Sequence, residues 1–378
     1  MHKKRILIFD TEVTGHHVEY LHHLLIKARR SQDEYIFCVS EDFINVKGTE
    51  FDWNYGNNVI FKYVNTDKAN EEVSMLKKAY RKSKLLHSVI KSCDVTHIFL
   101  ISLITFIPFL PFFVPSRIKV SGIIYNIYLY RWKKSSTFLK ILDVLKYIVL
   151  SYSKCIDRVY ILNDAASARV LNRLYKTRKY QYIVDPYIPL KDAHVRLDSL
   201  NIKIGNKIYL HFGSLSERKG TIDILEAIKL IQPENLLKNT FIFAGKVQKS
   251  IQTKFYQLID EIRIQKGCQI VTLDKFCDYG LIAELCKQSD ILLMPYKVVS
   301  QSSGVIGYAA QYNTPVLAPA KGLIGKLVKK YKLGYLIKRV SPYDIAAFII
   351  KCPQDKKKVP TEYLDINTVD NFINSIRF

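Results

Sequence analysis

The sequence has no CxxC pair and no cluster of cysteine with histidine, although it contains seven cysteines. They stand far apart along the chain, at Cys38, Cys93, Cys155, Cys268, Cys277, Cys286 and Cys352. A disulfide framework or a structural zinc site needs paired or regularly spaced ligands. We therefore expect a reduced, cytoplasmic protein without structural zinc.

Long hydrophobic runs are also missing. The segment MHKKRILIFD turns polar after four apolar residues, so it lacks the apolar core of a signal peptide and predicts a first β-strand. The most apolar segment, residues 98–114, falls short of the ~20 residues that a membrane span needs, and it contains Pro108 and Pro111. A buried strand followed by an apolar, membrane-touching helix is the favoured interpretation.

Acidic residues are scarce: the sequence contains 34 acidic and 57 basic residues, which gives a net charge of +23. A field of this sign attracts nucleic acid, anionic lipid headgroups or a diphosphate substrate. The basic residues are spread over both halves of the chain, and no recognisable nucleic-acid-binding module accompanies them. A nucleic-acid-binding protein stays an alternative, although we expect no nucleic-acid partner.

Short apolar runs alternate with helical patterns twice along the 378 residues, which predicts two α/β domains with mostly parallel sheets. The first series contains RILIFD, EYIFCVS, VIFKYV, THIFLIS, KVSGIIYNI and DRVYILN, and the second contains IYLHFG, FIFAG, QIVTL, DILLMP, PVLAP and GYLI. Runs that are apolar throughout, such as DILLMP, indicate strands covered by helices on both faces. The predicted fold is α/β, with two Rossmann-like doubly wound domains.

The domain boundaries follow from the prolines and from the broken periodicity between the two series. Residues 1–185 form the first domain, 186–206 a linker, and 207–350 the second domain. A C-terminal tail helix in residues 351–378 is expected to pack back on the first domain. Ligands of such sheets bind at the carboxyl ends of the strands, so two facing domains would place a site in the cleft between them.

The segment HFGSLSERKGTIDILEAI predicts an anion site in the second domain. Gly213 stands at a strand end, and Lys219 and Gly220 precede a helix that Thr221 would cap. Free N–H groups at a helix start and a nearby lysine together attract an anion. An ordinary loop with solvated Arg218 and Lys219 is the alternative.

A second loop of this kind lies in MPYKVVSQSSGVIGYAAQYNTPVLAP. Ser302 or Ser303 would cap a helix that begins near Gly304, which leaves the N–H groups of Gly304 and Val305 to meet an anion. Such a motif alone is more often an ordinary helix start. Two loops at equivalent strand ends of one domain strengthen the anion-site interpretation.

The N-terminal segment FDTEVTGHHVEYLHHLL holds the candidate side chains of the first domain. Gly15, His16 and His17 fall between the first strand and the first helix. Histidine titrates near neutral pH, so His16 and His17 are able to hydrogen-bond a phosphate or an acceptor hydroxyl. The alternative is the start of a surface helix, which is the preferred interpretation for His22 and His23.

The second half of the chain resembles glycosyltransferase family 4, the large retaining GT-B family of group 1 glycosyltransferases. Gly213, Leu215, Lys219 and Gly220 match its glycine-arginine-leucine turn and the lysine-glycine that follows, with Ser214 in place of the arginine. The resemblance implies that Lys219 contacts the diphosphate of the sugar donor. Arg218 is expected to supply the missing second cation.

Further on, Pro295, Pro315 and Val316 match the family, but Ser300 and Tyr308 replace its paired glutamates. The segment PYKVVSQSSGV resembles a subgroup whose loop reads proline-tyrosine and then serine-glycine-valine. The resemblance implies that this loop holds the donor phosphates. Many members also have a histidine in the region of SGIIYNIYLYRW, where this chain offers Tyr125 or Asn126 instead, so no catalytic base is assigned.

The resemblance implies a glycosyltransferase that moves a sugar from a nucleotide-diphosphate sugar to a glycan or polyprenyl-linked acceptor, with retention, in bacterial-type surface polysaccharide synthesis. The expected diphosphate-binding residues are Gly213, Ser214, Arg218, Lys219, Ser302, Ser303, Gly304 and Val305. Gly245, Tyr296 and Ser300 are expected in donor-side loops, and Gly15, His16 and His17 in a cleft-facing loop, with His16 and His17 as the catalytic candidates. No cofactor and no metal are expected, because the chain has no DxD-type site. A catalytically silent GT-B scaffold is the alternative, since the arginine and the glutamates are absent.

Peripheral contact with an anionic membrane is expected from KKAYRKSKLLHSVIKS, a basic helix with an apolar stripe, and from RWKK, which places Trp132 among cations. The stripe comprises Met75, Leu76, Leu85, Leu86, Val89 and Ile90. A helix that packs this stripe on the first domain is the alternative. Many relatives act on lipid-linked acceptors, so we expect the protein on the inner face of the cell membrane.

Overall fold

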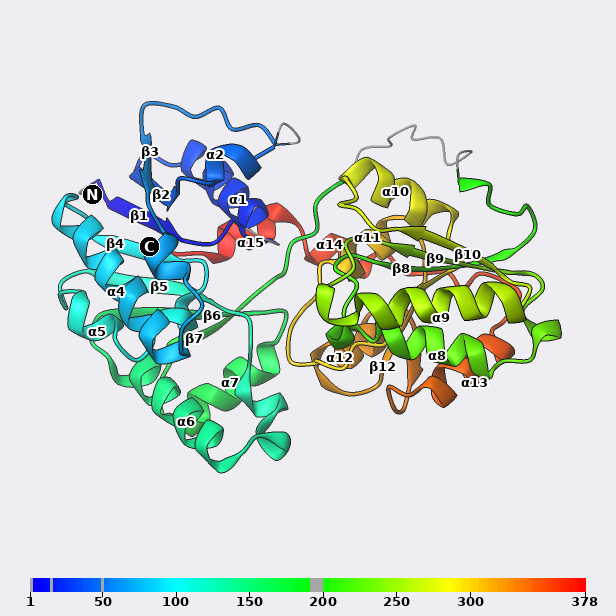
Figure 1. Cartoon of the computed structure of the whole chain (residues 1–378). Coiled ribbons are helices and arrows are strands. Elements are labelled where there is room, and N and C mark those ends of the chain that lie inside the picture. Colours follow the sequence, from blue (N-terminus) through cyan, green and yellow to red (C-terminus); the bar gives the residue numbers. More distant parts are fainter. Residues whose placement is uncertain (1–2, 14–15, 49–50, 191–199) are drawn as a thin grey trace. The chain divides into compact units, whose positions relative to one another are not determined.

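The computed structural model describes residues 3–13, 16–48, 51–190 and 200–378. It divides into a first unit of Met1–Val184 and Val369–Phe378 and a second unit of Asp185–Thr368 (Figure 1). The described part of the predicted linker therefore contributes to the second unit.

Contacts with the second unit explain where the linker segment lies. The backbone N–H of Tyr187 donates to the carbonyl of Asn367 at 3.0 Å, and the N–H of Leu190 donates to the Gln311 side chain at 2.8 Å. The expected tail of residues 351–378 is also divided. Its first part stays in the second unit, and its last helix packs against the first helix of the first unit.

The first unit is built on a seven-stranded sheet in the order β3-β2-β1-β4-β5-β6-β7. Every adjacent pair of strands is parallel. The strands are β1 (Arg5–Asp10), β2 (Glu34–Ser40), β3 (Val59–Val64), β4 (His97–Leu100), β5 (Lys119–Ile124), β6 (Ile156–Leu162) and β7 (Tyr180–Ile183). The strand order reverses between β1 and β4, which is where doubly wound sheets bind ligands.

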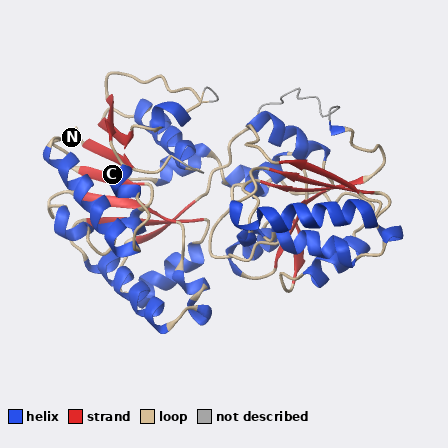
Figure 2. Ribbon diagram, viewed as in Figure 1, coloured by secondary structure: helices blue, strands red, loops and turns tan. Residues whose placement is uncertain are grey.

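Helices connect the strands of the first unit (Figures 1 and 2). They are α1 (His17–Arg29), α2 (Phe43–Val46), α3 (Asp67–Asn70), α4 (Met75–Lys91), α5 (Leu110–Phe113), α6 (Thr137–Tyr152), α7 (Ala165–Leu174) and α15 (Val369–Ser375), with the 3₁₀ helices η1 (Leu103–Phe106), η2 (Tyr128–Tyr130) and η3 (Trp132–Lys134). Residues of α4, α6 and α7 share one core cluster, whereas α1 packs against α15. This arrangement confirms a doubly wound first unit.

Two expectations for apolar segments of the first unit need correction. Residues 98–114 form a strand followed by η1 and the single turn of α5, and not one helix, because Pro108 and Pro111 interrupt the helical pattern. The stripe on α4 is divided, since Leu86, Val89 and Ile90 are buried in the core of the unit, whereas Met75 and Leu76 are exposed. Within the described residues, no helix has the length and apolar composition to cross a bilayer.

The second unit contains a six-stranded parallel sheet in the order β10-β9-β8-β11-β12-β13. The strands are β8 (Lys207–Phe212), β9 (Asn239–Ala244), β10 (Gln269–Leu273), β11 (Ile291–Leu293), β12 (Val316–Pro319) and β13 (Gly334–Ile337). The order reverses between β8 and β11. The loops that leave these two strands therefore flank the expected binding point of this sheet.

The helices of the second unit cover its sheet (Figures 1 and 2). They are α8 (Thr221–Leu230), α9 (Gln252–Gln265), α10 (Tyr279–Gln288), α11 (Val305–Gln311), α12 (Gly322–Lys330), α13 (Pro342–Lys351) and α14 (Glu362–Ile366), with the 3₁₀ helices η5 (Glu217–Lys219), η6 (Pro233–Asn235) and η7 (Lys249–Ile251). Helix α8 packs against both α9 and α13. The predicted α/β class with two Rossmann-like sheets is thus confirmed.

Candidate functional site

The loops after β8 and β11 touch each other at the point where the second sheet reverses its strand order. The backbone N–H of Lys297 donates to the carbonyl of Arg218 at 2.9 Å. Gly220 has a φ of +74°, and a Cβ there would collide with the carbonyl oxygen of Pro295. Glycine is therefore required for this close approach. The structure thus brings together the two loops that the sequence singled out.

Lys219 is the buried cation of this site, with only 9% of its surface exposed. Its ammonium donates to the carbonyl of Phe212 at 3.4 Å and lies 5.5 Å from the centre of the Tyr296 ring. Burial, reinforced by the nearby charge of Arg218, lowers the pKa of Lys219 to about 8. Among the described residues, no carboxylate pairs with Lys219. Its charge is therefore available to an anion.

Glycines shape the space around this lysine. Gly213 adopts a φ of +94°, and a Cβ there would occupy the position of the Lys219 ammonium. Gly245, at the end of β9, has a φ of +131°, and a Cβ there would collide with the Gly213 carbonyl. The predicted donor-side residue Gly245 consequently lies against Gly213. Both positions need glycine for the strand ends to pack this closely.

The other predicted cation, Arg218, is exposed, as is Ser214. Sequence reasoning missed Lys297, which pairs with Asp223 at 2.7 Å and also with Glu217. Burial opposes the charged form of Lys297, but the two carboxylates outweigh that effect and raise its pKa. The exposed Lys297 is therefore paired with carboxylates of the protein, whereas the buried Lys219 is not paired with a carboxylate of the described residues.

A buried hydrogen-bond chain supports the Lys219 loop. The carbonyl of Leu293 on β11 accepts from Nδ1 of His211 at 2.8 Å, so Nε2 is left to accept from the Thr221 hydroxyl at 2.9 Å. The same hydroxyl oxygen accepts from the backbone N–H of Ser216 at 2.9 Å. Burial lowers the pKa of His211 to about 4, which keeps it neutral near pH 7. The sequence signal was a histidine inside an otherwise apolar strand.

Two predicted helix caps are wrong. Gly220, not Thr221, is the N-cap of α8, because the Thr221 hydroxyl is engaged by His211 and Ser216. Gly304 is the N-cap of α11, in place of the predicted Ser302 or Ser303. The prediction that this helix begins near Gly304 is confirmed.

The residues around the start of α11 nevertheless gather at the site. Tyr296 is buried, and burial raises the pKa of its hydroxyl to about 12, an effect that the neighbouring Ser303 side chain opposes. Ser300 is buried as well, whereas Ser302 and Ser303 are partly exposed. These side chains leave the loop before α11 partly accessible to a ligand.

An aromatic residue, Tyr308, occupies the position at which the family has its second glutamate. Tyr308 on α11 is buried, and its ring centre lies 6.0 Å from that of Phe212 and 6.3 Å from that of Tyr279. The second glutamate position of the family is therefore part of an aromatic cluster in this chain. A carboxylate contact with the donor sugar is not available from this position.

In the first unit, His17 and Asp10 form the candidate pair at the reversal point of the sheet. Their atoms Nδ1 and Oδ2 are 2.7 Å apart, and Asp10 is buried. Because a carboxylate only accepts, Nδ1 is the donor in this bond. His16 is instead half-exposed and bonds Glu19 at 2.6 Å. Gly15 lies outside the described residues.

Two further groups complete this end of the first sheet. The buried Lys82 pairs with Glu12 at 2.5 Å. The ring of Tyr125, directly after β5, lies 6.2 Å from that of His17, in the region where the chain lacks the family histidine. Sequence reasoning missed Lys82, whose only signal was a lysine on the apolar side of α4.

His23 does not lie on a surface helix, contrary to expectation. Its side chain is buried, with ring centres 6.2 Å from Tyr20 and 5.9 Å from Phe372 of α15. Burial lowers its pKa to about 3, so it stays neutral. His22 is half-buried against Trp53 at 5.5 Å. Both residues are part of the packing of the unit.

No group of three or more histidine, cysteine, aspartate or glutamate side chains arranged to hold a metal occurs within the described residues. The seven cysteines are buried free thiols.

Comparisons with known proteins concern the fold and the family of the second unit. The family model described as "Glycosyl transferases group 1" matches residues 196–362. Among curated proteins, no sequence matches the chain. Anabaena HepE in complex with UDP and glucose has a TM-score of 0.63 and 16% identity, with 98% of this chain and 95% of that chain covered.

Two other solved structures show the same fold. WaaG, a glycosyltransferase involved in lipopolysaccharide biosynthesis, has a TM-score of 0.64 and 13% identity, with 98% of this chain and 94% of that chain covered. Sucrose-phosphate synthase from Thermosynechococcus elongatus has a TM-score of 0.66 and 12% identity, with 99% and 94% covered. These likenesses identify the fold as GT-B. The family match includes Lys219 and the loop before α11, so the second unit carries a region that matches the group 1 glycosyltransferases.

Proposed function

We propose that the protein transfers a sugar from a nucleotide-diphosphate sugar to a glycan or lipid-linked acceptor. The observation that carries this proposal is the buried, unpaired ammonium of Lys219 at the reversal point of the second sheet. When the bond between sugar and diphosphate breaks, negative charge grows on the departing phosphate. A preorganised cation stabilises that charge more in the transition state than in the bound donor.

We also propose that the chain resembles the family 4 members that have a Ser-Gly-Val loop. Ser303, Gly304 and Val305 stand at the head of α11, close to Tyr296, as family 4 members with a Ser-Gly-Val loop would require. The exposed Arg218 is the second cation that we expect to reach the donor diphosphate. The complexes of HepE with UDP and with UDP-glucose, in the same fold, favour a nucleotide sugar as the donor here.

We assign a retaining reaction in which the departing diphosphate takes the proton of the acceptor hydroxyl. No separate base is then needed. His17 is the side chain of the first unit that we expect to contact an acceptor hydroxyl, because Asp10 holds its ring in one orientation and fixes its tautomer. An NMR assignment of the anomeric configuration in the product tests retention, and an inverted product would contradict it.

Metal independence is a further part of the proposal. Lys219 supplies at the diphosphate the charge that a bound cation supplies in other transferases. We expect transfer to continue at an unchanged rate after treatment with EDTA. Loss of activity that Mg²⁺ or Mn²⁺ restores would show that a metal is required.

The acceptor and the cellular setting follow from charge and fold. A net charge of +23 favours anionic surfaces and substrates. WaaG, which shares the fold, acts in lipopolysaccharide biosynthesis. We therefore place the protein in surface polysaccharide synthesis, in the cytoplasm and peripheral on the inner face of the cell membrane.

A thermal-shift screen against UDP-, GDP-, ADP- and dTDP-sugars tests the proposal, because a ligand that binds the folded state raises its melting temperature. One nucleotide class should stabilise the wild type and not a Lys219→Ala variant. Release of the nucleoside diphosphate with that donor then distinguishes an enzyme from a silent scaffold. Absence of any stabilising donor would overturn the proposed function.

A further inference from the structure

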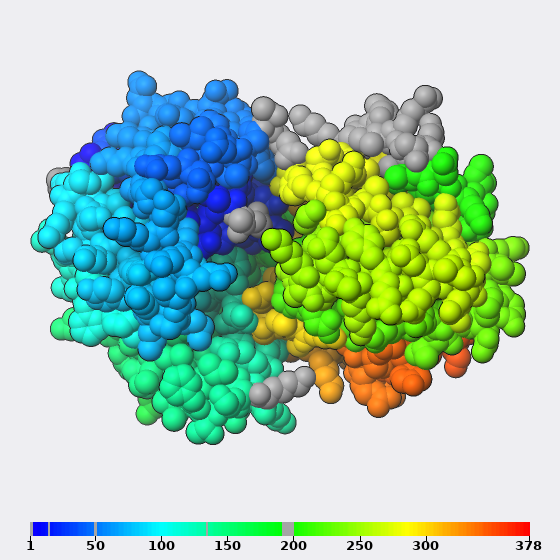
Figure 3. Space-filling view, viewed as in Figure 1, coloured from blue at the N-terminus to red at the C-terminus, as the bar shows by residue number. Residues whose placement is uncertain are grey.

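An apolar stripe on α6 faces outward from the first unit. Five large side chains are exposed by 39% to 69%: Phe138, Ile141, Leu145, Ile148 and Tyr152. Their spacing of three and four residues places them along one side of the helix. The segment that contains α6 forms the lower edge of the first unit in Figures 1 and 3. A stripe with this spacing normally packs inside a protein, so its exposure needs an explanation.

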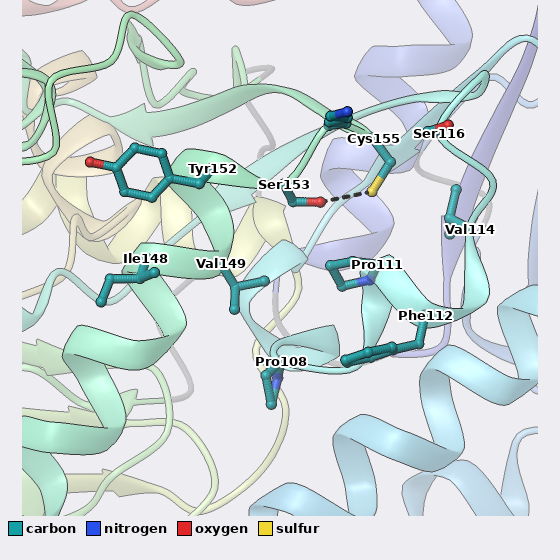
Figure 4. A pocket seen from close by; sticks show the side chains of 11 residues that line it. Pro108, Pro111, Phe112, Val114, Ser116, Ile148, Val149, Tyr152, Ser153 and Cys155 are labelled. Atoms are coloured by element: carbon teal, nitrogen blue, oxygen red, sulfur yellow. Dashed lines mark hydrogen bonds between the residues drawn. The ribbon is translucent and has the colours of Figure 1, made fainter.

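The stripe continues onto α5. Phe112 is 82% exposed, and it lines a pocket together with Pro108, Pro111, Ile148 and Tyr152. Figure 4 shows the α5 side chains and the α6 side chains on the two sides of this pocket. We call the combined area the α5–α6 apolar surface, defined by Phe112, Phe138, Ile141, Leu145, Ile148 and Tyr152.

The segment that carries most of this surface is strongly basic. Residues 131–154 contain six basic residues and one acidic residue. The acid, Asp143, is buried and paired with Arg131 at 2.5 Å, so it contributes little negative charge to the outer face. The ammonium of Lys140 lies 5.5 Å from the centre of the half-exposed Trp132 ring. Exposed apolar side chains within a cationic border match an anionic lipid interface.

We propose that the α5–α6 apolar surface docks the protein on an anionic bilayer, with α6 lying in the plane of the interface. Helix α6 has 16 residues, which is too short to span a bilayer but long enough to lie on one. The exposed side chains enter the boundary between headgroups and acyl chains, and the basic border meets the lipid phosphates. The docking surface is α6, whose stripe is exposed from Phe138 to Tyr152, whereas the second half of the α4 stripe packs in the core. The biological purpose, access to a lipid-linked acceptor, rests on the proposed function.

Co-sedimentation of the full chain with vesicles tests the docking. The vesicles contain phosphatidylcholine with or without phosphatidylglycerol, and no sugar donor is present. We compare the wild type with a Phe138→Ser, Ile141→Ser, Leu145→Ser variant, which keeps the charge unchanged. A matched control carries Val170→Ser and Leu174→Ser on α7, because these side chains are 50% and 57% exposed in the same unit.

The wild type and the control should bind vesicles that contain phosphatidylglycerol, and the triple variant should bind at least ~10-fold more weakly, since it exposes less apolar area to the interface. All three proteins should melt at similar temperatures, as the changed side chains are exposed. Equal binding by the triple variant, or equal binding by the wild type to pure phosphatidylcholine, would overturn the proposal.

A second copy of the chain is the other possible occupant of this surface. Sedimentation velocity measures dimer formation. If the wild type is a dimer, the triple variant is a monomer and neither protein binds vesicles, the surface is a dimer interface and the membrane proposal is refuted. The outcome is separate from the test of the proposed function. Vesicle binding without donor turnover would leave the docking intact and refute the enzyme, whereas turnover of a soluble acceptor without vesicle binding would do the reverse.

Discussion

The ammonium of Lys219 lies 5.5 Å from the centre of the Tyr296 ring, so a cation from the loop after β8 rests against an aromatic side chain from the loop after β11. Both side chains are buried. The contact joins the two strands between which the second sheet reverses its order. It places one unpaired positive charge at the point where a sheet of this type binds its ligand.

Replacing Lys219 with alanine should lower kcat/KM for donor turnover roughly 10²-fold, because a preorganised charge at the departing diphosphate is lost. Steady-state release of the nucleoside diphosphate measures this effect. Lys254→Ala serves as the control, since Lys254 is an exposed lysine of the same unit in a surface ion pair. Unchanged donor affinity and turnover in Lys219→Ala would refute the site assignment.

The pH dependence of donor use should reflect the lowered pKa of Lys219, which is about 8 in the free protein. Below this pH the ammonium is charged and binds the diphosphate, and above it the charge is lost. We therefore expect kcat/KM to fall as the pH rises through about 8. A Lys219→Arg variant keeps its charge at these pH values, so its profile should be flat in this range even if its activity is lower. Identical profiles would argue against Lys219 as the titrating group.

The Gly220→Ala variant should lower the melting temperature of the protein and weaken donor binding. The new Cβ adds about 1–2 kcal/mol of left-handed backbone strain and also collides with the Pro295 carbonyl. Gly205→Ala is the matched control, because Gly205 has a φ of +81° but no atom within 4 Å of an added Cβ. Differential scanning calorimetry should show the larger loss for Gly220→Ala. Equal losses would mean that backbone strain alone matters and that the loops do not need their close approach.

His17→Asn should reduce transfer to the acceptor more than His16→Asn does. Asp10 orients the ring of His17, whereas His16 is half-exposed and pairs with Glu19. Transfer to an acceptor and hydrolysis of the donor, measured side by side, separate the two roles. A loss of transfer with donor hydrolysis retained would support an acceptor contact, and equal effects of the two variants would refute the distinction.

Thr221→Val should destabilise the second unit by about 1–3 kcal/mol, because His211 loses a donor and the Ser216 N–H loses its acceptor inside the protein. Thr272→Val on β10 is the control for the same change in size, at a partly exposed strand position. Thermal melting compares the two variants. A Thr221→Val protein as stable as the control would show that the hydrogen-bond chain does not support the loop.

The sequence by itself determined the two α/β units and the positions of the two loops that follow β8 and β11. The strands of the second sheet are short, mostly apolar runs, and such runs can be recognised from neighbouring residues alone. Gly213, Lys219 and Gly220 were recognisable for the same reason, because a strand end, a basic loop and a helix start follow one another within eight residues.

Tertiary structure alone decided which of these side chains are charged, buried or free. Lys219 and Lys297 are both loop lysines in the sequence, but carboxylates from η5 and α8 neutralise Lys297 and leave Lys219 unpaired. The apolar stripes of α4 and α6 have similar spacing, yet the second half of the α4 stripe is buried in the core, whereas the α6 stripe is exposed along the helix. Periodicity shows that a helix has an apolar side, and only the packing of the whole unit determines whether that side already has a partner.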